Sequence, residues 1–171
     1  IRQRRGDANR LGVAVQLCLL RFPGQGLLPD ASMPMSLLQW IGRQLRIDPS
    51  CWPQYAEREE TRREHLLELR AYLGVEPFGL AHYRQAVHAT TELALQTDKG
   101  IVLAVNVLDT LRHRHIIIPA LDVIERVCAE AITRANRRIY ETLSEPLADT
   151  HRRRLDDLLK RRDNGKTTWL A

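Results

Sequence analysis

The chain has 171 residues, of which 44% are hydrophobic, so it can form one packed domain or two small ones. It contains no signal peptide and no long apolar run, so we expect a soluble intracellular protein. The net charge of +5 is modest for a nucleic-acid-binding protein, but 23 of the 26 basic residues are arginine. Arginine forks suit phosphate oxygens and guanine edges, although a GC-rich genome raises arginine content without any function.

The first ten residues are basic and carry one carboxylate, Asp7, among four arginines: Arg2, Arg4, Arg5 and Arg10. Two interpretations stay open for this segment, an arm over a phosphate backbone or a ragged end of the chain. Asp7 or Asn9 can cap a helix that runs to about Phe22. Residues 11–20 are apolar nearly all round, so we expect this helix to be buried at the centre of the fold.

A second helix is predicted from Pro34 to about Ile47. Its apolar stripe consists of Leu37, Leu38, Ile41 and Leu45, with Trp40 beside it. Arg43 and Arg46 lie toward its end, where cations interact favourably with the helix dipole. Asp48 and Pro49 then cap a short helix from about Ser50 to Ala56.

The stretch Arg58–Gly74 carries a full set of helix signals. Thr61 can act as the N-cap, and Glu64 can complete a capping box with it. The apolar face follows at helical spacing, with Leu66, Leu69 and Leu73. Gly74 comes where a left-handed residue ends a helix. This is the third helix of a tri-helical unit.

The basic start of this helix predicts a recognition helix for a DNA groove. The residues expected to read bases are Thr61, Arg62, Arg63 and His65. Five glutamates offset the charge of the stretch: Glu57, Glu59, Glu60, Glu64 and Glu68. Side-on contact with DNA would therefore be repulsive, and only the N-terminal end is expected to reach the bases. The alternative, a core helix with a solvated charged rim, stays open.

The second half of the chain predicts four more elements. A helix is expected from Leu80 to about Thr97, and another from Gly100 to Leu111, where a strand is the competing interpretation. Residues 112–115 form a basic end, and residues 116–118 an extended linker. Pro119 should then occupy the first turn of a long helix to about Leu143, whose expected apolar face is Leu121, Ile124, Cys128, Ile132, Ala135 and Ile139. Pro146 should begin a last, basic helix to about Arg162.

No catalytic or metal site is apparent. The cysteines Cys18, Cys51 and Cys128 lie far apart, without zinc-site spacing. His82 and His88 are six residues apart, so they do not share a helix face. No paired carboxylates, activated nucleophile or metal triad stands out. We therefore expect no enzyme activity, metal or cofactor in this chain.

These elements predict an all-α fold. About seven helices would form two small helix-turn-helix-like bundles around the buried first helix. The first unit would span residues 1–76, and the second residues 77–171. Phosphate contacts are expected from arginines throughout both units: Arg4, Arg5, Arg10, Arg43, Arg46, Arg58, Arg112, Arg114, Arg152, Arg153 and Arg154.

Five stretches, in the same order, resemble the N-terminal region of bacterial Tn-three family transposases, the DDE enzymes of replicative transposons. They are Arg5–Leu17, Leu20–Gly24, Ile41–Leu45, Tyr55–His65 and Arg114–Pro119. The resemblance implies a DNA-binding module for the terminal inverted repeats of a transposon. It also implies that the catalytic carboxylates lie downstream, in a ribonuclease-H-like domain outside this chain.

The expected function is sequence-specific binding of double-stranded DNA at transposon ends, as part of a transposase in bacterial DNA transposition and recombination. The expected location is the bacterial cytoplasm, in association with the nucleoid and not with a membrane. Because the chain begins at Ile1 and not at Met, we expect it to be a piece of a longer protein. The alternative function is a helical assembly or dimerisation module that docks other transposase domains or a second protomer.

Overall fold

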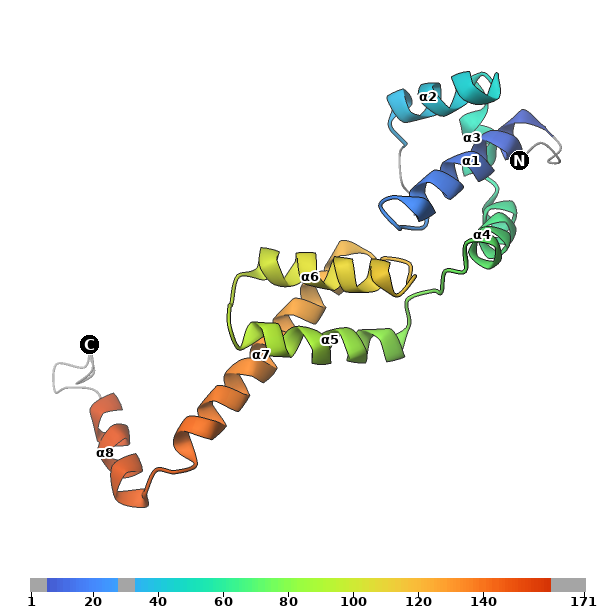
Figure 1. Cartoon of the computed structure of the whole chain (residues 1–171). Coiled ribbons are helices and arrows are strands. Elements are labelled where there is room, and N and C mark those ends of the chain that lie inside the picture. The colour runs from blue at the N-terminus through green and yellow to red at the C-terminus, as the bar shows by residue number, and fades with distance from the viewer. Residues whose placement is uncertain (1–5, 28–32, 161–171) are drawn as a thin grey trace.

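The computed structural model describes residues 6–27 and 33–160 of the chain. Within these ranges the fold is all-α and contains no strand, as predicted. The helices form two groups that follow one another along the chain, and α8 comes after both (Figure 1). One 3-10 helix, Pro49–Cys51, precedes α3, and the α-helices are α1 Asp7–Arg21, α2 Met35–Leu45, α3 Trp52–Ala56, α4 Glu59–Leu73, α5 Leu80–Ala94, α6 Gly100–His113, α7 Leu121–Ser144 and α8 Asp149–Leu159.

The first group of helices is built around α1, which contacts α2, α3 and α4. Residues 11–16 of α1 are buried, so the prediction of a central first helix is confirmed. The core beside it contains Leu38 and Ile41 of α2 and the fully buried ring of Tyr55. Gly12 allows this packing, because a Cβ atom at that position would lie within 2.3 Å of the Tyr55 ring.

The start of α4 corrects one prediction. The helix begins at Glu59, and its N-cap is Arg58, which makes no side-chain capping bond. Thr61 is therefore inside the first turn and is not the N-cap. Glu59 and Glu60 place two carboxylates in that turn, where the helix dipole favours negative charge and supports an earlier start. The predicted end is confirmed, because Gly74 is left-handed with φ 64°.

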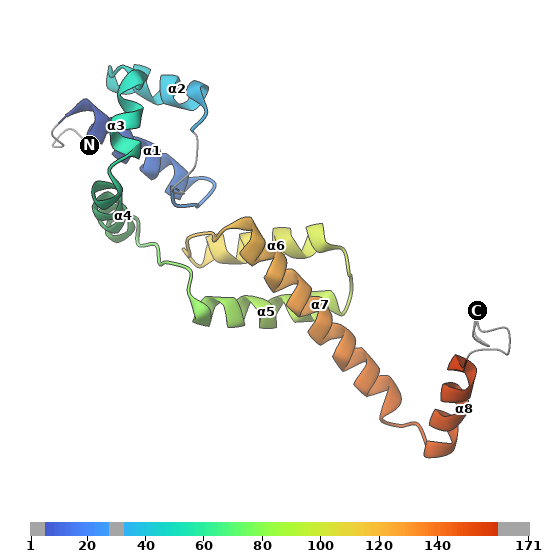
Figure 2. The same ribbon diagram turned by 180° about the vertical axis from the view of Figure 1, so that it is seen from behind.

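The second group consists of α5, α6 and α7. Figure 2 shows α7 crossing the pair formed by α5 and α6. Leu103, Val107 and Leu111 are spaced by four residues on α6 and are all buried in this core, which settles the competing strand interpretation in favour of a helix. The predicted division of the chain at residue 76 stays a prediction, as does helix-turn-helix packing.

The start of α7 and the burial of its apolar face differ from the prediction, whereas its end at Ser144 agrees with the predicted end near Leu143. The N-cap is Ala120, so Pro119 precedes the helix and does not lie in its first turn. Leu121 is 69% exposed and Ile139 37% exposed, although both were expected on the buried face. The helix is long, and its buried residues all lie between Ile124 and Ala135, where α5 and α6 pack against it. Similarly, α8 begins at Asp149, three residues after Pro146.

The two groups of helices meet at residues 116–118. The amide of Ile118 donates to the carbonyl of Gly24 at 2.8 Å, and the amide of Ile117 donates to Glu76 at 2.8 Å. The side chain of Ile117 packs against a small cluster that includes Leu20 and Leu69. The predicted linker is thus a structural joint, because its backbone pairs with segments that precede it by 40 to 93 residues.

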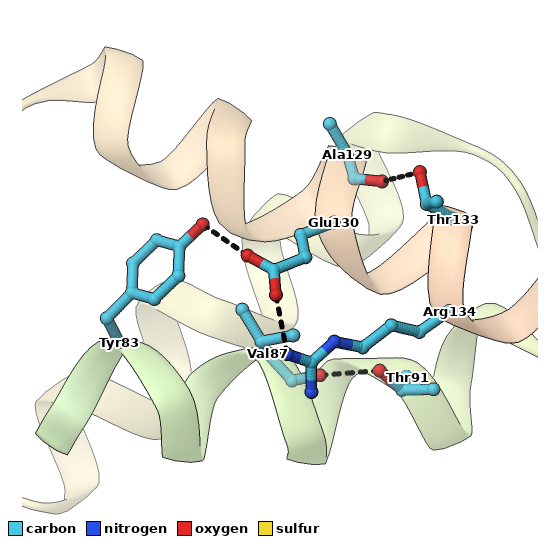
Figure 3. Close-up of polar contacts among 7 residues, drawn as sticks. All are labelled: Tyr83, Val87, Thr91, Ala129, Glu130, Thr133 and Arg134. Carbon is cyan, nitrogen blue, oxygen red and sulfur yellow. Dashed lines mark hydrogen bonds and ion pairs between the residues drawn. The ribbon is translucent and has the colours of Figure 1, made fainter. Parts of the chain in front are cut away.

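A polar contact links α5 to α7 (Figure 3). The Tyr83 hydroxyl donates to a Glu130 oxygen at 2.7 Å, and Arg134 donates to the other oxygen at 2.6 Å. The hydrogen bond from Tyr83, together with Arg134, lowers the pKa of Glu130 from its usual value. The same bond is the largest of the effects that raise the pKa of Tyr83.

We expect the stability contributed by this contact to depend on pH. Because the pKa of Glu130 is lowered by folding, its contribution is present above the carboxyl's ordinary pKa of about 4.3 and is lost as the pH falls through the folded value. Thermal unfolding of Glu130→Gln and wild type should therefore differ at pH 7 and converge toward pH 3. Glu125→Gln, at an exposed position of α7, is the control for the loss of one charge. A difference of equal size at both pH values would contradict the expectation.

Candidate nucleic-acid interface

The predicted base-reading residues of α4 do not share one exposed surface. Thr61 and Arg62 are half-buried, and the Arg62 carbonyl accepts a hydrogen bond from Gln16 Nε2 at 3.1 Å. Arg63 is exposed, but its guanidinium pairs with Glu59 at 2.6 Å. Among the four predicted residues, Arg63 is therefore the only one with an exposed side chain.

His65 lies in the core, so the prediction that it contacts DNA is wrong for this structure. Its side chain is 4% exposed, and its ring stacks on Tyr55 with centroids 5.7 Å apart. Gln16 Nε2 donates to the Tyr55 hydroxyl at 2.7 Å, and the same hydroxyl is hydrogen-bonded to His65 Nδ1 at 3.2 Å. The sequence contained a signal of this burial, because His65 precedes the buried Leu69 by one helical turn.

The surface around the start of α4 is acidic. Its exposed carboxylates are Glu57, Glu59, Glu60 and Glu64, against three guanidinium groups from Arg58, Arg62 and Arg63. Four negative and three positive charges leave the surface with a net charge of −1. This balance opposes a close approach of DNA phosphates.

The end of α2 has a different charge balance. Arg43 and Arg46 are exposed there and make no ion pair within the described part of the chain. Together with Gln39 they line a shallow hollow of about 360 Å³. Asp48 at its rim accepts a hydrogen bond from the Ser50 amide at 2.9 Å, and this bond lowers the pKa of Asp48 from its usual value.

Arg112 takes part in the joint between the two groups of helices. Its Nε donates to the Pro23 carbonyl at 3.1 Å, and its guanidinium lies 5.9 Å from the centre of the Phe22 ring. Another guanidinium nitrogen pairs with Asp109 at 3.3 Å. These contacts occupy the side chain that was predicted to bind phosphate, and sequence spacing could not show them because Pro23 is 89 residues away.

The other arginines that were predicted to contact phosphate differ in whether their side chains have partners within the chain. Arg10 pairs with Asp7 at 3.0 Å, Arg114 donates to Gln85 at 3.1 Å, and Arg152 donates to the Ser144 carbonyl at 2.8 Å. Arg58 is exposed at the N-cap of α4, and Arg153 and Arg154 are exposed on α8. Arg4 and Arg5 lie outside the described residues.

We also searched the described parts of the chain for metal sites, membrane-spanning helices and paired cysteines. Residues 6–27 and 33–160 contain no group of three or more His, Cys, Asp or Glu side chains that could hold a metal ion. None of the helices there combines the length and the apolar composition that a membrane crossing requires. The cysteines Cys18, Cys51 and Cys128 are unpaired thiols, and burial raises the pKa of Cys128.

Comparisons with known proteins agree on one group of relatives. A family model described as a domain of unknown function (DUF4158) matches residues 1–131. The transposase for transposon Tn21 of Escherichia coli is 63% identical, and that for transposon Tn501 of Pseudomonas aeruginosa 56% identical, each over all 171 residues of the chain. The transposase for transposon gamma-delta of Escherichia coli strain K12 is 30% identical over 147 residues, or 84% of the chain. The chain spans 17% of the length of the first two relatives and 15% of the third.

Proposed function

The chain belongs to the DUF4158 family and matches the N-terminal 17% of Tn-three family transposases, and from this premise we propose that it is a DNA-binding module of such a transposase. Its ligand is the double-stranded DNA of the terminal inverted repeats of the transposon. The catalytic step of transposition belongs to parts of the protein outside this chain.

The observation that carries the proposal is a set of exposed arginines without ion pairs among the described residues: Arg43, Arg46, Arg58, Arg153 and Arg154. They lie on α2, at the start of α4 and on α8, so they are distributed along the row of helices (Figure 1). An extended series of unpaired guanidinium groups suits the regular spacing of phosphates along a duplex. The net charge of +5 favours the same ligand.

Footprinting of the 171-residue chain tests the proposal on a duplex from the end of the element that encodes it. A scrambled duplex of the same composition is the control. Binding should prefer the transposon end, and the logarithm of the affinity should fall with the logarithm of the salt concentration, with a slope of about −0.9 per phosphate contacted. Affinity that does not change with salt, or equal affinity for both duplexes, would contradict sequence-specific DNA binding.

The arginines of α8 should contribute affinity without specificity. Arg153→Ala with Arg154→Ala is expected to weaken binding to both duplexes equally and to reduce the salt slope by about 0.9 for each lost contact. Arg152 is left unchanged because it donates to the Ser144 carbonyl at the end of α7. If the double variant binds as wild type does, at every salt concentration, α8 is a solvated surface and makes no phosphate contact.

A second candidate function, assembly of the transposase, is favoured by exposed apolar side chains near the C-terminus. Those of α7 are Ile139, Tyr140 and Leu143, and those of α8 are Leu155, Leu158 and Leu159. No residue of α8 is buried, so this amphipathic helix covers no core. Sedimentation of the chain with and without duplex separates the two functions. A stable dimer that ignores DNA would favour assembly, and a monomer that shifts only with duplex would favour recognition.

A further inference from the structure

We propose that the outer face of α2, formed by Ser36, Gln39, Trp40, Arg43 and Gln44, reads base edges in the major groove of duplex DNA. This inference rests on the proposed DNA-binding function and deepens it. It moves base recognition away from the start of α4, where the sequence pattern had placed it, to a helix whose arginines were expected to contact only phosphates.

The geometry of α2 places these five side chains on one side of the helix. The other four residues lie three, four, seven and eight positions after Ser36, which places all five on one face of the helix. All five are exposed. The opposite side holds Leu38 and Ile41, which are 2% and 3% exposed and pack into the core with α1. The core thus holds α2 in place and directs its polar side outward, as a groove-reading helix requires.

The chemistry of this face matches the major groove. Met35–Leu45 contains no carboxylate, so nothing on the helix itself repels phosphates. Glutamine amides can bond adenine through N6 and N7, and an arginine fork can bond guanine through O6 and N7. Trp40, 58% exposed, offers an apolar surface to a thymine methyl group. Arg46 follows directly at the C-cap, in position for a phosphate beside the groove.

By the same criteria, the start of α4 is less suited than α2 to contact base edges of DNA. It presents four exposed carboxylates, its exposed Arg63 is paired with Glu59 at 2.6 Å, and His65 is buried. Only one carboxylate, Asp48, borders the hollow that Gln39 and Arg43 line, and it accepts a hydrogen bond from the Ser50 amide. Charge complementarity therefore favours α2 as the helix that approaches DNA.

Three variants of the 171-residue chain test this assignment: Gln39→Ala, Arg43→Ala and Arg43→Lys. Each position is exposed, so thermal unfolding should match wild type. On a duplex from the transposon end, each variant should bind about 5- to 150-fold more weakly, the range for losing one bidentate base contact. On scrambled duplex the loss should be small for Arg43→Lys, which keeps the charge but not the fork.

Arg63→Ala is the matched control, an arginine exposed on α4, and should retain the preference for the transposon end. Protection of guanine N7 from dimethyl sulfate provides a second measurement that is specific for the major groove. Wild type should protect guanines within the site, and Arg43→Ala should lose protection at one of them, whereas Arg63→Ala should lose none.

The remaining outcomes separate this inference from the function on which it rests. Equal losses on both duplexes would make Arg43 a phosphate contact and overturn base reading by α2. Specific binding that all three variants leave unchanged would overturn it too, and would leave this face to a protein partner. Failure of wild type to prefer the transposon end would overturn the proposed function itself.

Discussion

Gly12→Ala is expected to destabilise the first group of helices by about 3 kcal/mol, at the upper end of the usual cost of overpacking a core. The added methyl group would lie 2.3 to 2.4 Å from three atoms of the Tyr55 ring. That ring cannot move aside, because it is 0% exposed and its hydroxyl is hydrogen-bonded to both Gln16 and His65. Urea unfolding followed by circular dichroism and tryptophan fluorescence measures the loss.

Gly100→Ala is the matched control for this substitution. Gly100 is the first residue of α6, and a Cβ atom there would meet nothing within 4 Å. Its stability should be unchanged or should rise by about 0.5–1 kcal/mol, because alanine restricts the unfolded chain more than glycine does. If Gly12→Ala also left the stability unchanged, the close packing of α1 on Tyr55 would be contradicted.

Leu103→Ala should destabilise the second group of helices by about 2–5 kcal/mol, the range for a leucine truncated in a well-packed core. Leu103 is 0% exposed and lies in the cluster formed by α5, α6 and α7. Hydrogen exchange adds a test of the predicted division at residue 76. Amides of α5–α7 should exchange faster in the variant, whereas those of α1–α3 should be protected as in wild type.

Leu67→Ala, at a position 60% exposed on α4, should change the stability by less than about 0.5 kcal/mol. Faster exchange of all helices in Leu103→Ala would show that the chain unfolds as one cooperative unit through the joint at residues 116–118. The predicted two-unit organisation would then be wrong.

The sequence alone was sufficient for the helices, because their signals are local. The length of the apolar segment that forms α6 favoured a helix over a strand, although it contains three valines and one isoleucine, and Gly74 marked the end of α4. Errors occurred at helix starts, where several residues competed as caps. At α4 the Thr61 capping box was outweighed by two glutamates that suit the first turn of a longer helix.

The candidate site depended more on tertiary structure. Eleven of the 23 arginines were predicted to contact phosphate, since charge alone does not show what lies beside a guanidinium group. The fold then assigned Arg112 to the joint with Pro23 and Phe22, and paired Arg63 with Glu59. It left Arg43 exposed on α2, on a face without carboxylates.

The sequence by itself determined that the chain is a series of helices with a buried first helix, because periodicity and local helix signals act within a few residues. Only the tertiary structure decided what the polar residues of those helices do. His65 is buried because Tyr55 and Gln16 meet it in the core, and residues 116–118 form a joint because Gly24 and Glu76 pair with them. These partners are 10 to 94 residues away in the chain, and contacts over such separations arise only when the helices pack.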